Sequence, residues 1–243
     1  VDSLSRLIRE IPSRYIGIHI ESSLDIIFLY IACLKVNKNP VIFNSLWGSE
    51  QINKAIKKYR IDHIISTWDR GKQIKGDAVV YYFEEIVNSS KGCGIPSDIK
   101  TENDFESILF TSGTSDFPKA VCLKRSNFHE SSKLWNDQIR FNLEDRYTIC
   151  LPIYHIAGLS IIYRSIYYRF QLEIINSYRD INIANGSIIS LIPSILNRII
   201  SKDEYINVLK SYRAIILGGE PADEQLLQKC INLGLKVFVS YGM

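Results

Sequence analysis

Short β-branched segments alternate with longer helical patterns along the chain, and this alternation constrains the fold more than any other feature of the sequence. Near the amino end, strand-like segments at Tyr15–Ile20, Pro40–Asn44 and Asp62–Thr67 are separated by helical patterns at Ser23–Val36 and Glu50–Tyr59. The connections between them are short. This β-α-β-α-β order predicts a parallel sheet with helices packed on its faces.

The alternation continues to the carboxyl end of the chain. Residues 88–103 are rich in Ser, Gly, Lys, Pro and Asp, which predicts an exposed connection between two halves. The further strands are expected at Ala78–Phe83, Ser107–Phe110, Lys119–Lys124, Arg146–Leu151, Leu172–Ile175, Ser187–Ile192, Arg213–Gly219 and Lys236–Gly242. We therefore expect an α/β fold with two packed layers of mostly parallel sheet and flanking helices. The predicted subdomains are residues 1–103 and 104–243.

Composition excludes several classes of protein. The chain has 243 residues, of which 46% are hydrophobic and 23% are charged, so it buries enough apolar surface to fold without disulfides or a structural metal. The formal net charge of +3 comes from scattered Lys and Arg. The densest basic run, Asn53–Arg60, predicts the solvent face of a helix. We therefore expect no nucleic-acid partner, because such proteins gather basic residues on one face.

Nothing in the sequence predicts a membrane span or a metal centre. The most apolar segment, Ser23–Val36, is too short to cross a bilayer and carries Asp25 and Lys35. The five cysteines are odd in number and include no Cys-x-x-Cys, which argues against zinc and favours thiols in a reducing compartment. We expect a cytoplasmic protein without a metal site built from its own ligands. The sequence leaves the oligomeric state open, a homo-oligomer included.

The first candidate site is the segment TSGTSDFPK, Thr111–Lys119, directly after an expected buried strand. Four hydroxyl side chains and Gly113 occupy the five positions 111–115. Hydroxyl donors, backbone N–H groups and a lysine in one loop suit the oxygens of a polyphosphate. The segment differs from the GxxxxGK[ST] nucleotide loop, because its lysine follows a proline and precedes a strand. A Ser/Thr-rich turn with a solvated lysine is the alternative explanation.

Three further segments carry candidate residues. In LPIYHIAGLS, Leu151–Ser160, a histidine stands near an expected helix start, although a lone histidine also suits a core or cap position. In ILGGEP, Ile216–Pro221, two glycines end an expected strand, so a planar group could lie against bare backbone there. An ordinary strand-to-helix turn is the alternative. In SYGM, Ser240–Met243, a tyrosine could stack on a base.

Taken in order, these four segments resemble the large amino-terminal domain of the adenylate-forming superfamily. This superfamily includes acyl- and aryl-CoA ligases, peptide-synthetase adenylation domains and luciferases. The resemblance covers nearly the whole chain and is most specific from Ser107 to Met243. Within the superfamily, the segments PIYHIAGLSIIYRS and ILGGEPADEQLLQKCINLGLKVFVSYGM are most similar to the o-succinylbenzoate–CoA ligases of menaquinone biosynthesis.

The resemblance implies an ATP-dependent carboxylate–CoA ligase that uses Mg²⁺ and CoA and acts on a small-molecule carboxylic acid. The acid attacks the α-phosphate of ATP to give an acyl-adenylate and pyrophosphate, and the thiol of CoA then attacks the adenylate. The implied phosphate-loop residues are Thr111, Ser112, Gly113, Thr114, Ser115 and Lys119, and those flanking the adenine are Gly218, Gly219, Glu220, Pro221 and Tyr241. The implied acyl-substrate residues are His155, where the carboxylate meets the phosphate, with Gly158, Ser160 and Arg164. His155 and Lys119 are the candidate catalytic residues.

The sequence also departs from the family pattern. Asp116 stands where the family's phosphate loop usually has glycine. The given sequence stops before the Thr-Glu pair that follows Tyr-Gly-Met in the family, and the family's carboxy-terminal lid domain with its catalytic lysine is absent from it. We therefore expect an incomplete amino-terminal part that is inactive alone. Another acyl-, aryl- or amino-acid-adenylating enzyme and a non-catalytic nucleotide- or partner-binding remnant are the alternatives. Arg164 is open to two explanations, a partner for an acidic substrate or a surface or structural arginine.

Overall fold

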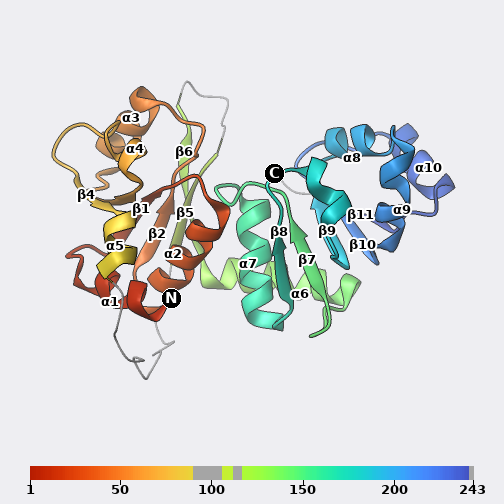
Figure 1. Cartoon of the computed structure of the whole chain (residues 1–243), viewed down its shortest axis with the longest axis horizontal. Helices are drawn as coiled ribbons and strands as arrows, with labels where there is room; N and C mark the ends of the chain where they lie inside the picture. Colours follow the sequence, from red (N-terminus) through yellow and green to blue (C-terminus); the bar gives the residue numbers. More distant parts are fainter. Residues whose placement is uncertain (90–105, 112–116, 241–243) are drawn as a thin grey trace. The chain divides into compact units, whose positions relative to one another are not determined.

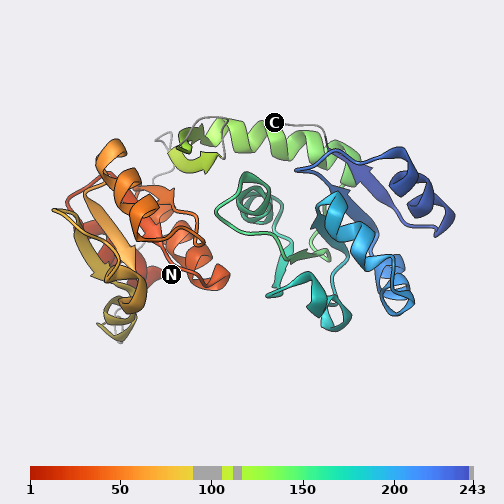
Figure 2. The same ribbon diagram turned by 90° about the horizontal axis from the view of Figure 1, so that it is seen from above.

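The computed structural model describes residues 1–89, 106–111 and 117–240 (Figure 1). By their contacts these residues divide into two compact units. Unit 1 contains residues 1–128 and Ile153–His155, and unit 2 contains the remainder. The division falls within α6, Arg125–Ile139, which is one continuous helix (Figure 2). The predicted boundary between residues 103 and 104 lies outside the described residues.

Unit 1 contains a six-stranded sheet in the order β4-β3-β1-β2-β5-β6. Every described pairing in it is parallel except that of β5 with β6, which is antiparallel. The strands are β1 Tyr15–His19, β2 Asn39–Ile42, β3 His63–Ser66, β4 Val79–Tyr82, β5 Glu106–Thr111 and β6 Lys119–Lys124. The accompanying helices are α1 Asp2–Glu10, α2 Ser23–Lys35, α3 Ser49–Tyr59, α4 Trp68–Gly71 and α5 Phe83–Ser89.

Unit 2 contains a five-stranded sheet in the order β11-β10-β9-β7-β8, and all of its described pairings are parallel. The strands are β7 Arg146–Ile149, β8 Gln171–Ile174, β9 Ile188–Leu191, β10 Ala214–Leu217 and β11 Val237–Val239. Its helices are α7 Ile156–Tyr168, the 3₁₀ helix η1 Tyr178–Ile183, α8 Pro193–Ile199, α9 Asp203–Ser211 and α10 Glu224–Asn232. The α/β fold predicted from the sequence is confirmed.

Local sequence signals explain where several helices begin. Ser22 precedes α2, and its hydroxyl accepts a hydrogen bond from the backbone N–H of Asp25. Asp223 precedes α10 and accepts one from Leu226 N at 2.6 Å. These side chains satisfy backbone donors that a helix leaves unpaired at its first turn. Pro193 opens α8, because a first-turn position needs no backbone N–H.

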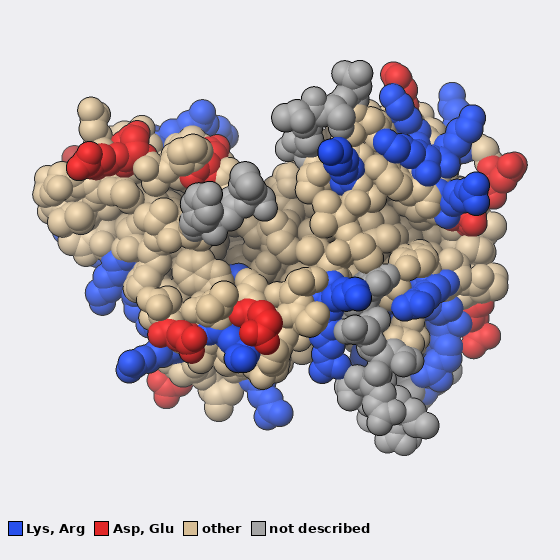
Figure 3. All heavy atoms as spheres, turned by 180° about the vertical axis from the view of Figure 1, so that it is seen from behind, with Lys and Arg blue, Asp and Glu red and all other residues tan. Residues whose placement is uncertain are grey.

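The core of unit 1 joins α3 to the sheet through aromatic rings. Ile52, Ala55 and Ile56 of α3 are buried in one cluster that includes Phe43 and Phe110. The rings of Phe43 and Phe110 stack with their centroids 5.4 Å apart. The opposite side of α3 carries exposed lysines, and Lys and Arg gather over this part of the molecule in Figure 3. The solvent face predicted for Asn53–Arg60 is therefore confirmed.

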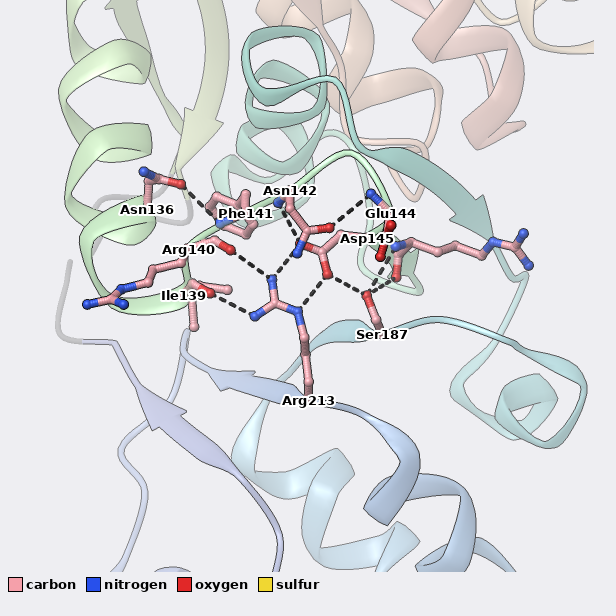
Figure 4. A network of polar contacts seen from close by, with 10 residues as sticks. Asn136, Ile139, Arg140, Phe141, Asn142, Glu144, Asp145, Ser187 and Arg213 are labelled. Atoms are coloured by element: carbon pink, nitrogen blue, oxygen red, sulfur yellow. Dashed lines mark hydrogen bonds and ion pairs between the residues drawn. The ribbon is translucent and has the colours of Figure 1, made fainter.

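A polar network joins the end of α6 to the sheet of unit 2 (Figure 4). The guanidinium of Arg213 forms an ion pair with Asp145, whose side chain is only 3% exposed. Arg213 also donates to the backbone carbonyl of Ile139 at 2.7 Å. Asp145 accepts further hydrogen bonds from Asn142 N at 2.9 Å and from the Ser187 hydroxyl at 2.8 Å. A buried carboxylate is stable here because several donors surround it.

Among the described residues, no helix is long and apolar enough to cross a membrane.

Candidate active site

The described ends of the candidate phosphate loop lie opposite each other in unit 1. Thr111 is the last residue of β5 and Lys119 the first of β6, and these two residues pair in the antiparallel ladder. Both are exposed to solvent. The intervening candidates Ser112, Gly113, Thr114 and Ser115, together with Asp116, lie outside the described residues. The hairpin therefore brings a hydroxyl and an ammonium group to the two ends of the hydroxyl-rich segment.

A buried aromatic ring anchors the carboxyl end of this loop. Phe117 is 8% exposed, and its ring centroid lies 6.3 Å from that of Trp47 and 6.4 Å from that of Tyr59. The ammonium groups of Lys54 and Lys58 lie over the same ring, 5.1 and 5.0 Å from its centroid. Cations in this position are attracted by the negative face of the ring. The polypeptide is thus fixed by packing immediately before Pro118 and Lys119.

His155 follows β7 and directly precedes α7. Its side chain is exposed, and its ring lies 4.6 Å from the ring of Tyr154, which is buried. Partial removal from water lowers the pKa of His155 below 6.5, so the imidazole is neutral at pH 7. A neutral ring has one donor and one acceptor nitrogen. The exposure of the side chain excludes a core histidine, whereas a capping position at the start of α7 stays open.

The other acyl-substrate candidates lie on α7 in unit 2. Gly158 and Ser160 are buried, and the Ser160 hydroxyl donates to the carbonyl of Ile156 one turn earlier. Arg164 lies one helical turn after Ser160 and is 6% exposed. The surface alternative for Arg164 is therefore wrong, whereas the structural and substrate-binding alternatives stay open.

The surroundings of Arg164 leave part of its guanidinium unsatisfied. The Arg164 Cζ atom lies 5.6 Å from the ring centroid of Trp135, and Nη2 is 3.5 Å from the Ser131 hydroxyl. Among the described residues, Nε has no hydrogen-bond partner and no carboxylate forms an ion pair with Arg164. Burial lowers the pKa of Arg164, opposed by its interaction with Tyr147. A buried cation of this kind favours an anion as its partner.

The candidate adenine residues follow β10 in unit 2. A Cβ atom at Gly218 would lie 2.2 Å from the Ser240 hydroxyl, so any other residue here would require that hydroxyl to move. Gly219 has φ +80°, a conformation that favours glycine. Glu220 accepts hydrogen bonds from the backbone N–H and the hydroxyl of Ser194 at 3.0 and 3.1 Å. Pro221 is exposed, and Tyr241 lies outside the described residues.

The structure adds residues that the motifs did not indicate. Trp135 and Ser131 of α6 contact Arg164, and Ser194 of α8 holds Glu220. These partners are 26 to 33 positions away in sequence, and no local pattern connects them. Within the described part of the chain, no group of three or more His, Cys, Asp and Glu side chains is arranged to hold a metal ion.

Comparison with known proteins defines the class. The model of the AMP-binding enzyme family matches residues 4–243, and the chain belongs to this family. Its predicted place in the adenylate-forming superfamily is confirmed. Solved structures with the same fold include ATP-bound MatB from Rhodopseudomonas palustris, with a TM-score of 0.88 at 18% identity, covering 100% of this chain and 52% of that one.

Particular relatives are succinylbenzoate ligases. The chain is 27% identical over 245 aligned positions to the 2-succinylbenzoate–CoA ligase of Bacillus pumilus (strain SAFR-032), covering 94% of this chain and 48% of that protein. The o-succinylbenzoate CoA synthetase (MenE) from Bacillus subtilis, in complex with AMP, has a TM-score of 0.85 at 21% identity, covering 100% of this chain and 65% of that one. The chain spans about half the length of the curated relatives that it matches.

Proposed function

We propose that this chain is the amino-terminal, nucleotide- and acyl-binding part of a cytoplasmic ATP-dependent carboxylate–CoA ligase, with 2-succinylbenzoate as its acid. The observation that carries the proposal is the β5–β6 hairpin, which places Thr111 opposite Lys119 at the ends of a hydroxyl-rich segment in a chain of the AMP-binding enzyme family. Relatives named as 2-succinylbenzoate–CoA ligases support the choice of acid.

The proposed chemistry has two steps. A carboxylate oxygen of the acid forms a bond to the α-phosphorus of MgATP, and the bond from that phosphorus to pyrophosphate breaks. The thiol of CoA then gives up its proton to solvent and its sulfur bonds to the acyl carbon, while the bond from that carbon to the phosphate oxygen breaks and AMP leaves. Lys119, Thr111 and the neighbouring hydroxyls hold the phosphate oxygens, which positions the phosphorus for attack and stabilises developing charge. Magnesium arrives with ATP as part of the substrate.

Each remaining candidate has a binding role in this proposal. Neutral His155 donates a hydrogen bond where the carboxylate meets the phosphate. The bare backbone at Gly218 and Gly219, with Glu220 and Pro221, lies along the adenine, and Tyr241 stacks on it. Gly158 and Ser160 line the acyl pocket. Arg164 supplies the positive charge for the second carboxylate of 2-succinylbenzoate, which is the feature that separates this acid from simple aryl acids.

Isothermal titration calorimetry with MgATP tests the proposed role of Lys119 in nucleotide binding. Loss of a charge-assisted contact costs about 1.5–3 kcal/mol, so Lys119→Ala should weaken MgATP binding roughly ten- to a hundredfold. Lys124→Ala is the matched control, because it removes an exposed lysine from the far end of the same strand. Equal affinities of the two variants would contradict the phosphate role of Lys119.

A pair of acyl-adenylate analogues tests whether 2-succinylbenzoate is the acid substrate. Wild-type protein should bind the analogue of 2-succinylbenzoate at least tenfold more tightly than one whose second carboxylate is replaced by a methyl group. Arg164→Met should remove this preference while retaining the apolar volume of the side chain. Equal binding of both analogues by the wild type would reject 2-succinylbenzoate and leave another acyl or aryl acid.

A further inference from the structure

The strand that carries Lys119 lies at the edge of its sheet. β6 pairs with β5 on one side and is the last strand in the order of the described sheet. An edge strand has backbone N–H and C=O groups that no neighbouring strand satisfies. Two such groups flank Lys119 at the start of β6, namely the carbonyl of Pro118, the residue before the strand, and the N–H of Ala120.

The hydroxyl of Tyr59 satisfies both groups. It donates to the carbonyl of Pro118 at 2.9 Å and accepts from the N–H of Ala120 at 3.1 Å. In a parallel sheet, one residue of a neighbouring strand makes this same pair of bonds, donating to one residue and accepting from the residue two positions further on. A single side-chain oxygen therefore takes the place of a strand at Lys119.

The position of this hydroxyl is fixed by its surroundings. Tyr59 is the last residue of α3, and Arg60 ends the helix in the left-handed region with φ +52°. The Tyr59 ring lies 5.6 Å from the ring of Phe110 on β5. It also lies 6.4 Å from Phe117, with the Lys58 ammonium 5.4 Å from the centroid of Tyr59 itself. Packing on both sides holds the ring, so the hydroxyl needs little further ordering to make its two bonds.

We propose that Tyr59 is a positioning residue for Lys119, whose backbone it clamps from both sides so that the ammonium group is directed to the phosphates of MgATP. The inference rests on the proposed function, because it gives Lys119 a nucleotide to hold. Tyr59 itself does not touch the nucleotide. Removing the hydroxyl frees the peptide units on both sides of Lys119, so the lysine must be ordered when the nucleotide binds, and affinity falls.

The test compares MgATP affinities by isothermal titration. Tyr59→Phe keeps the ring and should weaken binding about three- to tenfold. In a Lys119→Ala background the same substitution should have no further effect, because the residue that it positions is gone. Tyr81→Phe is the matched control. Tyr81 lies on β4, the opposite edge strand of the same sheet, and its hydroxyl is 3.0 Å from His63 Nδ1. Removing this hydroxyl should leave MgATP affinity unchanged.

The possible results separate the two proposals. If the wild type binds no MgATP, both the proposed function and this inference fail. If the wild type binds but Tyr59→Phe binds equally well, or weakens binding by the same factor with and without Lys119, only the inference fails. Should Tyr59→Phe not fold, hydrogen exchange of the wild type decides: the Ala120 amide should be protected, and fast exchange would overturn the clamp.

Discussion

At the scale of single residues, His19 is the least satisfied side chain of the described core. It lies at the end of β1 with 0% exposure, and neither ring nitrogen has a hydrogen-bond partner among the described residues. Burial, and then the charge of Arg70, lower the pKa of His19 to about 4. The ring is therefore neutral in the folded protein over the physiological range, and its nitrogens cost free energy because water no longer solvates them.

His19 should make the protein sensitive to mild acid. In the unfolded chain a histidine has a pKa of about 6.5, so between pH 6.5 and 4 the unfolded state binds a proton that the native state does not. The free energy of unfolding should thus decrease as the pH falls through this window, by about 2 kcal/mol at pH 5. His19→Leu should remove this component and add about 1–3 kcal/mol at pH 7, since it replaces an unsatisfied polar ring by an apolar group.

Urea unfolding at pH 7 and pH 5 measures both effects. His63→Gln is the control, because the His63 ring is partly exposed and has Tyr81 as its partner, and this variant retains His19. A His19→Leu protein that loses as much stability between the two pH values as the wild type would show that His19 is solvated or paired.

His155 allows a complementary prediction about binding rather than folding. Because its side chain is exposed and its ring contacts that of Tyr154, with no side-chain hydrogen bond to another described residue, His155→Ala should change the melting temperature little. In a full-length ligase of the kind proposed above, the same change should decrease acyl-adenylate formation about ten- to a hundredfold, measured as ATP–pyrophosphate exchange. A lower melting temperature with unchanged specific activity would assign His155 to structure instead.

At the scale of elements, the Asp145–Arg213 ion pair ties the end of α6 to the sheet of unit 2. Burial opposes ionisation of Asp145, but hydrogen bonds from Arg213, Asn142 and Ser187 outweigh it and hold its pKa below 3.8. Arg213→Ala should cost about 2–3 kcal/mol, less than a fully buried pair because the arginine side chain is 33% exposed. The pair stabilises the fold above pH 4 and loses its effect as the pH falls through the lowered pKa of Asp145.

Chemical unfolding of Arg213→Ala at pH 7 and pH 3 tests this prediction. The difference from wild type should shrink at the lower pH. Arg146→Ala serves as the control, because the distance from its guanidinium to the Glu173 carboxylate is long, at 4.0 Å, and the Arg146 side chain is 42% exposed. This substitution should therefore cost about 0.5 kcal/mol or less. A loss for Arg146→Ala as large as that for Arg213→Ala would refute the special role of the buried pair.

The elements themselves were largely predictable. Every described strand lies at a segment that the sequence analysis expected. The signal is strong for the buried parallel strands, because these are apolar on both faces. Helices α1, α4, α5 and α9 and the 3₁₀ helix η1 were not predicted, since each has nine residues or fewer and therefore shows too few turns for a helical period to stand out. The partners of Arg164 and Tyr59 could not be predicted, because they meet through tertiary packing across 29 to 61 positions and no periodicity encodes such contacts.

At the scale of the whole molecule, each unit has candidate residues at the carboxyl ends of the strands of its own sheet. In unit 1, Thr111 ends β5. In unit 2, Gly218 and Gly219 follow β10 directly. Ligands of open parallel sheets bind beyond the carboxyl ends of the strands, where loops leave the sheet and backbone groups are free. Both sets of candidates therefore lie where an open parallel sheet can bind a ligand, although they belong to separate sheets.

The sheet of unit 2 also has an edge that favours self-association. β11 is one of the two edge strands of the described sheet. It pairs only with β10 among the described strands and carries Val239 at 54% exposure. An apolar edge offers free backbone groups to a second chain, so the average mass in sedimentation velocity should increase with protein concentration. Val239→Lys should suppress this increase by placing a charge on the edge. Ile231→Lys, which adds the same charge at an exposed position of α10, should not. A wild type that stays monomeric at every concentration, or equal suppression by both lysines, would show that β11 does not mediate association.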